Sequence, residues 1–175
     1  ESMSEGPRII NASNLEAIAG LMSGQFGPWG RQLRITRWMI WVFALFSGDF
    51  NPLHLWDWVA KRGPFGRIVA HGQLIVAKLP RLRPEPIFKL WDVRQPVLIS
   101  ADAKFRSPVG LGDKIHAHER VAGVKVDDKG ILLMIKYQVT LVGDDTKVVL
   151  EGSVTLFYPF SKTKIATVPT MKAAE

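Results

Sequence analysis

The chain has 175 residues, 47% of them hydrophobic, which is enough apolar material for one buried core and points to a single domain. It contains no cysteine, which excludes a disulfide framework and a thiolate metal site. The net charge of +7 suits a polyanionic partner, but the basic residues are scattered and lack the aromatic-interleaved pattern of nucleic-acid binding, so no nucleic acid is expected.

The most apolar run, residues 38–46, is far shorter than the roughly 20 residues that cross a bilayer. We therefore expect no membrane insertion and, without a recognisable signal peptide, a cytoplasmic location. Residues 1–13 are predicted to be an N-terminal extension or tag remnant. Residues 14–158 are predicted to form the single domain, and residues 159–175 a flexible tail.

The first half of the chain carries helical signals. Residues 14–22 predict a short helix, with Asn14 as one possible N-cap. A second helix is expected from Thr36, its N-cap, through Phe46, stopping at Ser47-Gly48.

Two further helices follow. Asn51 suits an N-cap and Pro52 the first position of a short helix that Gly63-Pro64 closes. The last predicted helix, also apolar, is expected from Gly72 to about Leu79, ending near Pro80.

Beyond residue 97 the apolar period changes from that of a helix to that of a strand. Residues 114–121, 135–141 and 148–156 alternate apolar and polar side chains, and residues 127–130 and 143–145 supply turns. These segments predict half-exposed antiparallel strands. Helices followed by a strand meander indicate an α+β layer fold.

Two histidines on one predicted strand face, His116 and His118, are the obvious metal-ligand pair. They share that face with Lys114 and Arg120, which repel a cation. We interpret this face as exposed and polar and predict no metal.

The stretch Ser47-Gly48-Asp49-Phe50-Asn51-Pro52-Leu53-His54 carries the strongest chemical signal. An acid and an imidazole stand five positions apart across a turn, so Asp49 and His54 can hold one water between them as general acid and base. The structural alternative is that Asp49 shapes the turn and that His54 is a satisfied imidazole. Asn51 suits a side-chain-to-backbone bond in the same turn.

Residues 47–54, followed by Ala70-His71-Gly72, resemble the signature of the MaoC-like (R)-specific enoyl-thioester hydratases. Residues 15–29 followed by 33–36, and residues 103–113, look most like the nodulation-protein-N-like branch. The resemblance covers about residues 14–158. It implies the hotdog fold, a curved antiparallel sheet wrapped around a central helix.

The resemblance implies hydration of trans-2-enoyl thioesters to (R)-3-hydroxyacyl thioesters, and the reverse dehydration, without a cofactor. Asp49 and His54 match its catalytic pair. The backbone N–H at Gly72 matches its oxyanion donor, at a helix start where no Cβ blocks the substrate. Asn51 and His71 are added as candidate substrate-binding residues, with a structural role as the alternative for both.

The implied partner is a thioester of coenzyme A or of acyl carrier protein, and the implied assembly is a homodimer. The candidates for holding the carrier phosphates are the basic residues that flank the motif: Lys61, Arg62, Arg67, Lys78 and Arg81. A group of tryptophans near the motif suits either core or subunit contact or a wall of the acyl pocket: Trp38, Trp41, Trp56 and Trp58. Trp56 stands where the family usually has an acid.

Two alternatives stay open. A hotdog acyl-thioesterase needs a carboxylate without a histidine partner, so the presence of both Asp49 and His54 argues against it. A non-catalytic acyl-thioester-binding protein is the other alternative.

Overall fold

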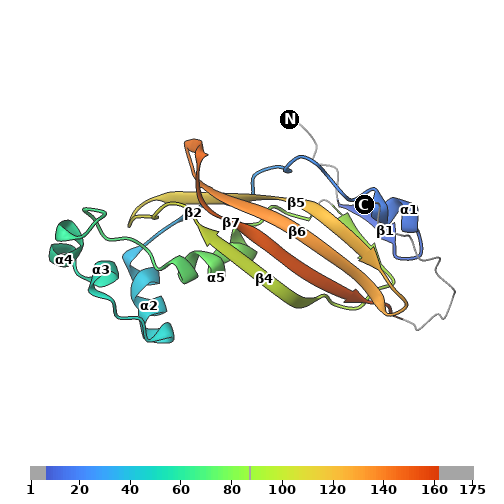
Figure 1. Cartoon of the computed structure of the whole chain (residues 1–175), viewed down its shortest axis with the longest axis horizontal. Helices are drawn as coiled ribbons and strands as arrows, with labels where there is room; N and C mark the ends of the chain where they lie inside the picture. Colours follow the sequence, from blue (N-terminus) through green and yellow to red (C-terminus); the bar gives the residue numbers. More distant parts are fainter. Residues whose placement is uncertain (1–6, 87, 162–175) are drawn as a thin grey trace.

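A five-stranded antiparallel sheet dominates the computed structural model, which describes residues 7–86 and 88–161 (Figure 1). The spatial order of its strands is β2-β5-β6-β7-β4. Their bounds are Leu33–Arg34 (β2), Val97–Phe105 (β4), Lys114–Val126 (β5), Gly130–Leu141 (β6) and Asp144–Pro159 (β7). The three strands and two turns predicted from the alternation are confirmed, and each strand is longer than its predicted core. Most of the predicted tail, from residue 162 on, lies outside the described residues.

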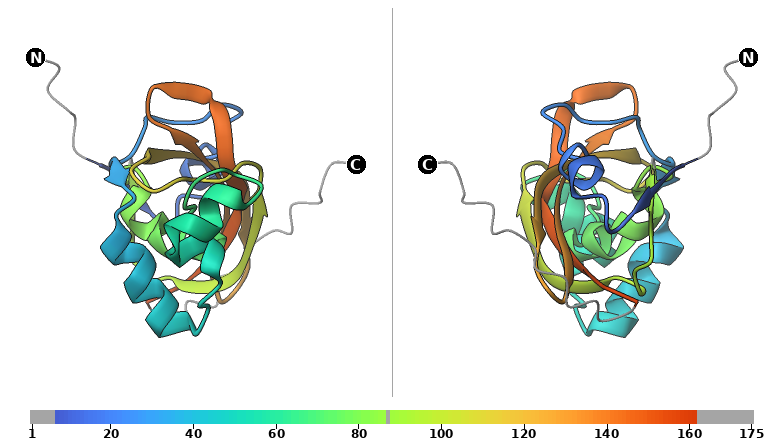
Figure 2. Two further views of the ribbon diagram at one scale, coloured as in Figure 1. Left: turned by 90° about the vertical axis from the view of Figure 1, so that its left-hand side faces the viewer. Right: turned by 90° about the vertical axis from the view of Figure 1, so that its right-hand side faces the viewer.

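The sheet curves around helix α5 (Gly72–Leu82), as the end-on views of Figure 2 show. One face of β6 supplies buried side chains at alternate positions, among them Tyr137 and Val139. They pack with Leu74 and Ile75 of α5 in the larger core cluster. A register shift between Val121 and Gly123 interrupts the β5–β6 ladder, and such a bulge increases bending and twist. The predicted α+β fold with a wrapped central helix is confirmed.

Helix α5 was predicted to end at about Leu79, before Pro80, but it continues through Pro80 to Leu82. Proline costs a helix one backbone hydrogen bond and usually kinks or ends it. Here the last turn is anchored by Leu79 and Leu82, which are 7% and 0% exposed. Tertiary burial therefore outweighs the local signal. None of the helices among the described residues is long and apolar enough to cross a membrane.

The caps of helix α2 (Arg37–Ser47) are those predicted. The Thr36 hydroxyl accepts a hydrogen bond from the Met39 backbone N–H at 3.3 Å, and Gly48 ends the helix at φ +75°, a conformation that favours glycine.

The single helix predicted after Asn51 is instead two helices, α3 (Pro52–Leu55) and α4 (Asp57–Arg62). They are separated by Trp56 in an extended conformation, whose indole meets Trp41 edge-on at 5.6 Å. The Asn51 cap and the end at Gly63 are as predicted.

A smaller layer closes the far end of the sheet. Strand β1 (Arg8–Asn11) pairs in parallel with β3 (Phe88–Trp91), next to α1 (Leu15–Ala19). Helix α1 has the predicted Asn14 cap but ends at Gly20, shorter than predicted. The buried residues of this layer pack with two residues of β6 in a second core cluster: Ile10, Ala12, Ile18, Ile131 and Leu133.

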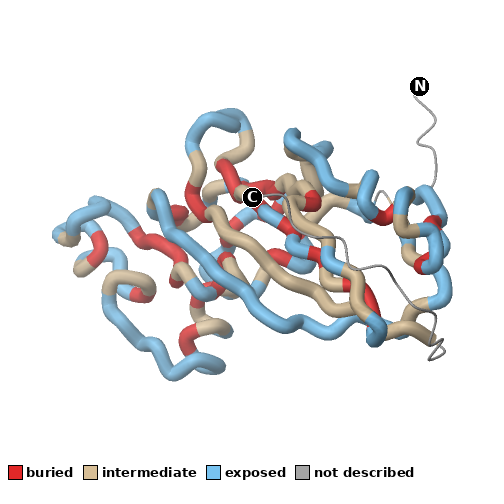
Figure 3. Tube along the Cα trace, turned by 45° about the vertical axis from the view of Figure 1, so that its right-hand side comes forward, coloured by how far each residue is buried: buried red, intermediate tan, exposed pale blue. Residues whose placement is uncertain are grey.

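The sheet face that carries His116 and His118 was predicted to be exposed, but it is covered by an upstream loop. Trp29 stacks on both imidazoles at 3.9 Å, and Phe26 stacks on His118 at 4.2 Å. Residues 23–30 are held across β5 by backbone bonds, including Gly30 N–H to the Ala117 carbonyl at 2.7 Å. His116 is consequently only 6% exposed. Figure 3 shows how buried and exposed stretches are distributed along the trace.

Candidate active site

The turn between α2 and α3 is fixed by its own side chains. The Ser47 hydroxyl donates to the Phe43 carbonyl at 2.7 Å and accepts from the Asp49 backbone N–H at 3.2 Å. Asp49 Oδ1 accepts from the Asn51 backbone N–H at 3.2 Å, and Asn51 Oδ1 caps α3 through the Leu53 N–H at 3.0 Å. Four short-range bonds thus fix the turn, one of them to the Asp49 carboxylate, and the Asn51 side chain caps α3.

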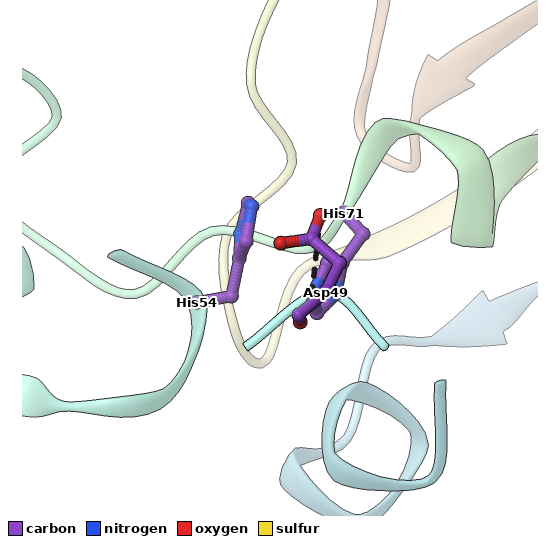
Figure 4. Close-up of side chains that lie close together, drawn as sticks. All are labelled: Asp49, His54 and His71. Atoms are coloured by element: carbon purple, nitrogen blue, oxygen red, sulfur yellow. Dashed lines mark hydrogen bonds and ion pairs between the residues drawn. The ribbon is translucent and has the colours of Figure 1, made fainter. Parts of the chain in front are cut away.

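Three side chains converge beside this turn, as Figure 4 shows. Ligand-type atoms of Asp49, His54 and His71 all lie within 4.8 Å of one another. The two imidazole rings are 3.9 Å apart between centroids and tilted by 33°. The predicted pair is therefore brought together, and His71, from the residue before α5, joins it.

The hydrogen bond of His54 decides which of its nitrogens is free. Its Nδ1 lies 2.7 Å from the backbone carbonyl oxygen of Val69. A carbonyl only accepts, so Nδ1 carries the hydrogen and Nε2 keeps its lone pair in the neutral ring. His54 therefore presents an acceptor, the form required of a general base.

His71 is buried, at 2% exposure, and contacts the backbone of Asp49. Its Nε2 donates to the Asp49 backbone carbonyl at 3.0 Å and lies 3.9 Å from the Asp49 carboxylate. Its Nδ1 is buried without a hydrogen-bond partner among the described residues. Burial is the main cause that lowers the pKa of His71, the bond to the Asp49 carbonyl opposes the shift, and the neighbouring His54 adds to it. A neutral ring with a hydrogen on Nε2 fits the bond to the Asp49 carbonyl and leaves the Nδ1 lone pair without a partner among the described residues.

His54 and Gly72 line a cavity of about 500 Å³, whose walls are mostly apolar. The other lining residues include Leu53, Phe65, Val69, Ile75, Phe105, Arg106 and Val109. Asp49 is not among the residues that line this cavity. The cavity has the size and the apolar character of a small-molecule site.

Gly72 is the first residue of α5, where backbone N–H groups lack helical partners. A Cβ at this position would lie 2.7 Å from the Phe105 ring, so the glycine is required by a neighbouring side chain as well as by access to the N–H. Sequence reasoning did not select Phe105 or Phe65. The contact of Phe105 with Gly72 joins the end of β4 to the start of α5, and no local pattern indicates such a tertiary contact.

The five candidate phosphate-binding residues do not form one cluster. Lys61 and Arg62 line a separate groove beside α4, whereas Arg67 is bound by Asp113 through two hydrogen bonds of 2.9 and 2.8 Å. Lys78 and Arg81 lie in the C-terminal half of α5, and Arg81 borders a third cavity at that end.

Asp49, His54 and His71 are close enough together to hold a metal ion. However, the Nε2–H of His71 is committed to the Asp49 carbonyl, and its Nδ1 is buried. The carboxylate and His54 Nε2 remain, fewer than the three protein ligands of a typical catalytic zinc site. The three residues therefore do not form a typical zinc site.

Comparison with known proteins agrees with this architecture. The solved structure described as "(R)-hydratase from A. caviae involved in PHA biosynthesis" superposes with a TM-score of 0.60 at 23% identity, covering 78% of this chain and 98% of that one. The fold is the hotdog fold, as predicted.

The chain belongs to the MaoC-like family, also as predicted: the family described as "MaoC like domain" matches residues 29–142, more than half of the chain. The 3-hydroxybutyryl-CoA dehydratase of Methylorubrum extorquens is 35% identical over 121 residues, covering 67% of this chain and 69% of that protein. The 3-hydroxyacyl-thioester dehydratase Z of Mycobacterium tuberculosis is 30% identical over 116 residues, covering 66% and 74%.

Proposed function

We propose that this protein hydrates trans-2-enoyl thioesters to (R)-3-hydroxyacyl thioesters and catalyses the reverse dehydration. The observation that carries the proposal is the orientation of His54, whose Nδ1–H is tied to Val69 so that Nε2 stays available as an acceptor beside the Asp49 carboxylate. The names of the two curated relatives, both dehydratases of 3-hydroxyacyl thioesters, support the same reaction.

In hydration, the Asp49 carboxylate and His54 Nε2 each accept one hydrogen of the same water. One of the pair removes a proton while the water oxygen bonds to C3 of the enoyl group, and the C2–C3 π electrons move toward the thioester oxygen. The pair then returns one proton to C2. The net change is one hydroxyl on C3 and one hydrogen on C2, so the site ends as it began.

The negative charge that develops on the thioester oxygen needs a hydrogen-bond donor. The backbone N–H at Gly72 is at the N-terminus of α5, where the aligned peptide dipoles also favour negative charge. The apolar cavity that Gly72 and His54 share would take the acyl chain, which keeps bulk water away from the reacting atoms.

A single assay separates this reaction from its alternatives. Crotonyl-CoA is mixed with the protein and the loss of enoyl absorbance is followed, with chiral analysis of the product. Loss of absorbance with (R)-3-hydroxybutyryl-CoA as product supports the proposal. Release of free thiol would instead indicate a thioesterase, and binding without turnover would indicate a non-catalytic acyl-thioester-binding protein.

A further inference from the structure

The cavity that Arg81 borders, here called the distal cavity, lies at the C-terminal end of α5. It has a volume of about 470 Å³ and is formed by residues between 80 and 86 together with side chains of β5, β6 and β7. We propose that the distal cavity binds a small organic acid, a molecule with one carboxylate on an apolar body. This second ligand site goes beyond the proposed hydratase reaction and does not depend on it.

The distal cavity is separate from the cavity lined by His54 and Gly72. Among the described residues, none lines both. Gly72 opens α5 at the proposed catalytic site, whereas Pro80 and Arg81, near the end of the same helix, line the distal cavity. A helix rises about 1.5 Å per residue, so Gly72 and Arg81 are about 13 Å apart along its axis. A ligand in the distal cavity therefore leaves the catalytic cavity free.

Much of the wall of the distal cavity is apolar. Val121, Ile135 and Leu156, from three neighbouring strands of the sheet, line it. The connector that follows α5 adds Pro84 and Pro86. Proline has a fixed φ and no backbone N–H, so this part of the wall keeps its shape and offers no backbone donor of its own. A preformed apolar wall favours a ligand with an apolar body, because little has to be ordered on binding.

Four arginines and two glutamates line the same cavity, and each glutamate is bound by an arginine. Arg83 binds Glu119 through two hydrogen bonds, and their side chains are only 30% and 19% exposed. Arg31 binds Glu85 at 2.6 Å in an exposed pair. The two carboxylates are thus neutralised by their partners and do not repel an incoming anion strongly.

The other two arginines leave an excess of positive charge. Neither Arg81 nor Arg120 has a carboxylate partner among the described residues. Arg120 donates to the Ser23 carbonyl at 2.8 Å and lies 5.6 Å from the centre of the Phe26 ring. Both of these contacts are with neutral groups, so the charge of Arg120 is not cancelled. The cavity therefore attracts an anion.

Two hydrogen-bond donors fit a carboxylate in this position. Both carboxylate oxygens of Glu119 accept from Nε and Nη2 of Arg83, which leaves Arg83 Nη1 without a partner among the described residues. Burial is the main cause that raises the pKa of Tyr158, Arg83 opposes the shift, and Glu119 adds to it. The Tyr158 hydroxyl is therefore protonated at neutral pH and close enough to the Arg83–Glu119 pair to feel its charges. A guanidinium and a hydroxyl together can serve both oxygens of one carboxylate.

The first test is calorimetric titration of the whole chain with octanoate, a carboxylate with an apolar tail. Tyr158→Phe keeps the ring and removes only the hydroxyl, and it should raise Kd by roughly 10- to 150-fold, the range for a hydrogen bond to a charged group. Arg81→Gln should also raise Kd and flatten its dependence on salt. Lys89→Gln is the matched control, because it removes the same charge from an exposed position that does not line the cavity. No binding by the wild type, or one Kd shared by the wild type, Tyr158→Phe and Arg81→Gln, overturns the proposal.

The second test separates the two parts of the ligand. Octanol has the apolar tail without the charge, and inorganic phosphate has a charge without the tail. Octanoate should bind roughly tenfold or more tightly than either, because only octanoate uses both the apolar wall and the donors. Equal binding of octanol would mean that the carboxylate is not recognised, and equal binding of phosphate would mean a general anion surface. Either result overturns the proposal.

The third test locates the ligand. Phe65→Leu alters the cavity lined by His54 and Gly72 and should leave the Kd for octanoate unchanged. A raised Kd in Phe65→Leu with an unchanged one in Tyr158→Phe would place octanoate in that cavity and overturn the proposal. So would competitive inhibition of crotonyl-CoA hydration with an inhibition constant equal to the calorimetric Kd. If octanoate binds with the expected pattern but crotonyl-CoA does not react, the distal site stands and the proposed function fails.

Discussion

His71 holds Asp49 by its backbone: His71 Nε2 lies 3.0 Å from the Asp49 carbonyl oxygen, beneath the carboxylate of the proposed catalytic pair. Replacing His71 with Leu keeps most of the buried volume but removes the donor, leaving the Asp49 carbonyl to move. We expect kcat for crotonyl-CoA hydration to fall roughly tenfold or more, because small displacements of a reacting group are costly. His71→Gln, which retains an N–H donor, should lose less. Equal losses in the two variants would contradict a positioning role.

Asp49 and His54 are expected to act as one unit on one water. Asp49→Asn and His54→Ala should each lower kcat by roughly 10²–10⁴-fold. The double variant should be little worse than the worse single variant, since members of a catalytic unit are not additive. Steady-state kinetics on the three variants, with circular dichroism to check folding, measures this. Near-normal kcat in both single variants of an active hydratase would place the chemistry elsewhere in the cavity.

Gly72→Ala tests the contact between α5 and Phe105. The new Cβ would lie 2.7 Å from the Phe105 ring, so the ring must shift, and Phe105 is part of the cavity wall. Alanine is also the better helix former, by up to about 1 kcal/mol, so the net change in unfolding free energy should stay small. We expect activity to fall by roughly tenfold while the melting temperature changes little. Truncating the ring in Gly72→Ala with Phe105→Leu should restore part of the activity.

His118 makes stability depend on pH. Burial is the main cause that lowers its pKa below the ordinary 6.5, the Gln138 bond opposes the shift, and His116 and Asp145 act in opposite directions. The folded state therefore binds fewer protons than the unfolded state, so the contribution of His118 is complete above about pH 6.5 and is lost as pH falls below it. Urea unfolding at pH 7.5 and 5.5 should show this loss.

The matched variant for this test is His118→Phe, which keeps an aromatic ring between Phe26 and Trp29 but cannot titrate. Its unfolding free energy should drop less than that of the wild type between the two pH values. The buried His71 contributes in the same direction in both proteins and cancels in the comparison. An identical drop in both proteins would mean that His118 is not a source of the dependence.

The protein is expected to be a homodimer at micromolar concentration. Strand β4 ends the sheet on one side, and all nine of its residues are exposed, including the apolar Val97, Leu98 and Ile99. An exposed apolar edge of this length favours pairing with a second copy. Light scattering should give twice the chain mass, and Leu98→Lys should shift the population toward monomer. Ile9→Lys, at an exposed apolar position on β1, is the control; a monomeric wild type would refute the prediction.

Local signals predicted the elements that are decided locally. The caps at Thr36, Gly48 and Asn51 fixed the limits of α2 and the start of α3, and the two-residue alternation gave the long strands. They failed at Trp56 and Pro80. At Trp56 the predicted helix is broken, and the indole makes an edge-on contact with Trp41. At Pro80 the helix continues because its last turn is buried. In both places tertiary contacts outweigh propensity.

The site was predictable to a similar degree. The spacing of Asp49 and His54 across a glycine–proline turn was enough to bring them together. The bonds that set their chemistry go to the backbone carbonyls of Val69 and Asp49, and a backbone acceptor leaves no mark in a sequence. The covering of His118 by an upstream loop was missed for a related reason, because alternation identifies two faces but not what packs on each.

Strand β6 belongs to both core clusters, with Ile131 and Leu133 in one and Tyr137 and Val139 in the other. The proposed chemistry lies entirely at the end served by Tyr137 and Val139. The end formed by β1, α1 and β3 has its own buried cluster, so substitutions there should lower the stability of the fold before they displace the reacting groups. Strand β6 is the element through which the two ends are joined.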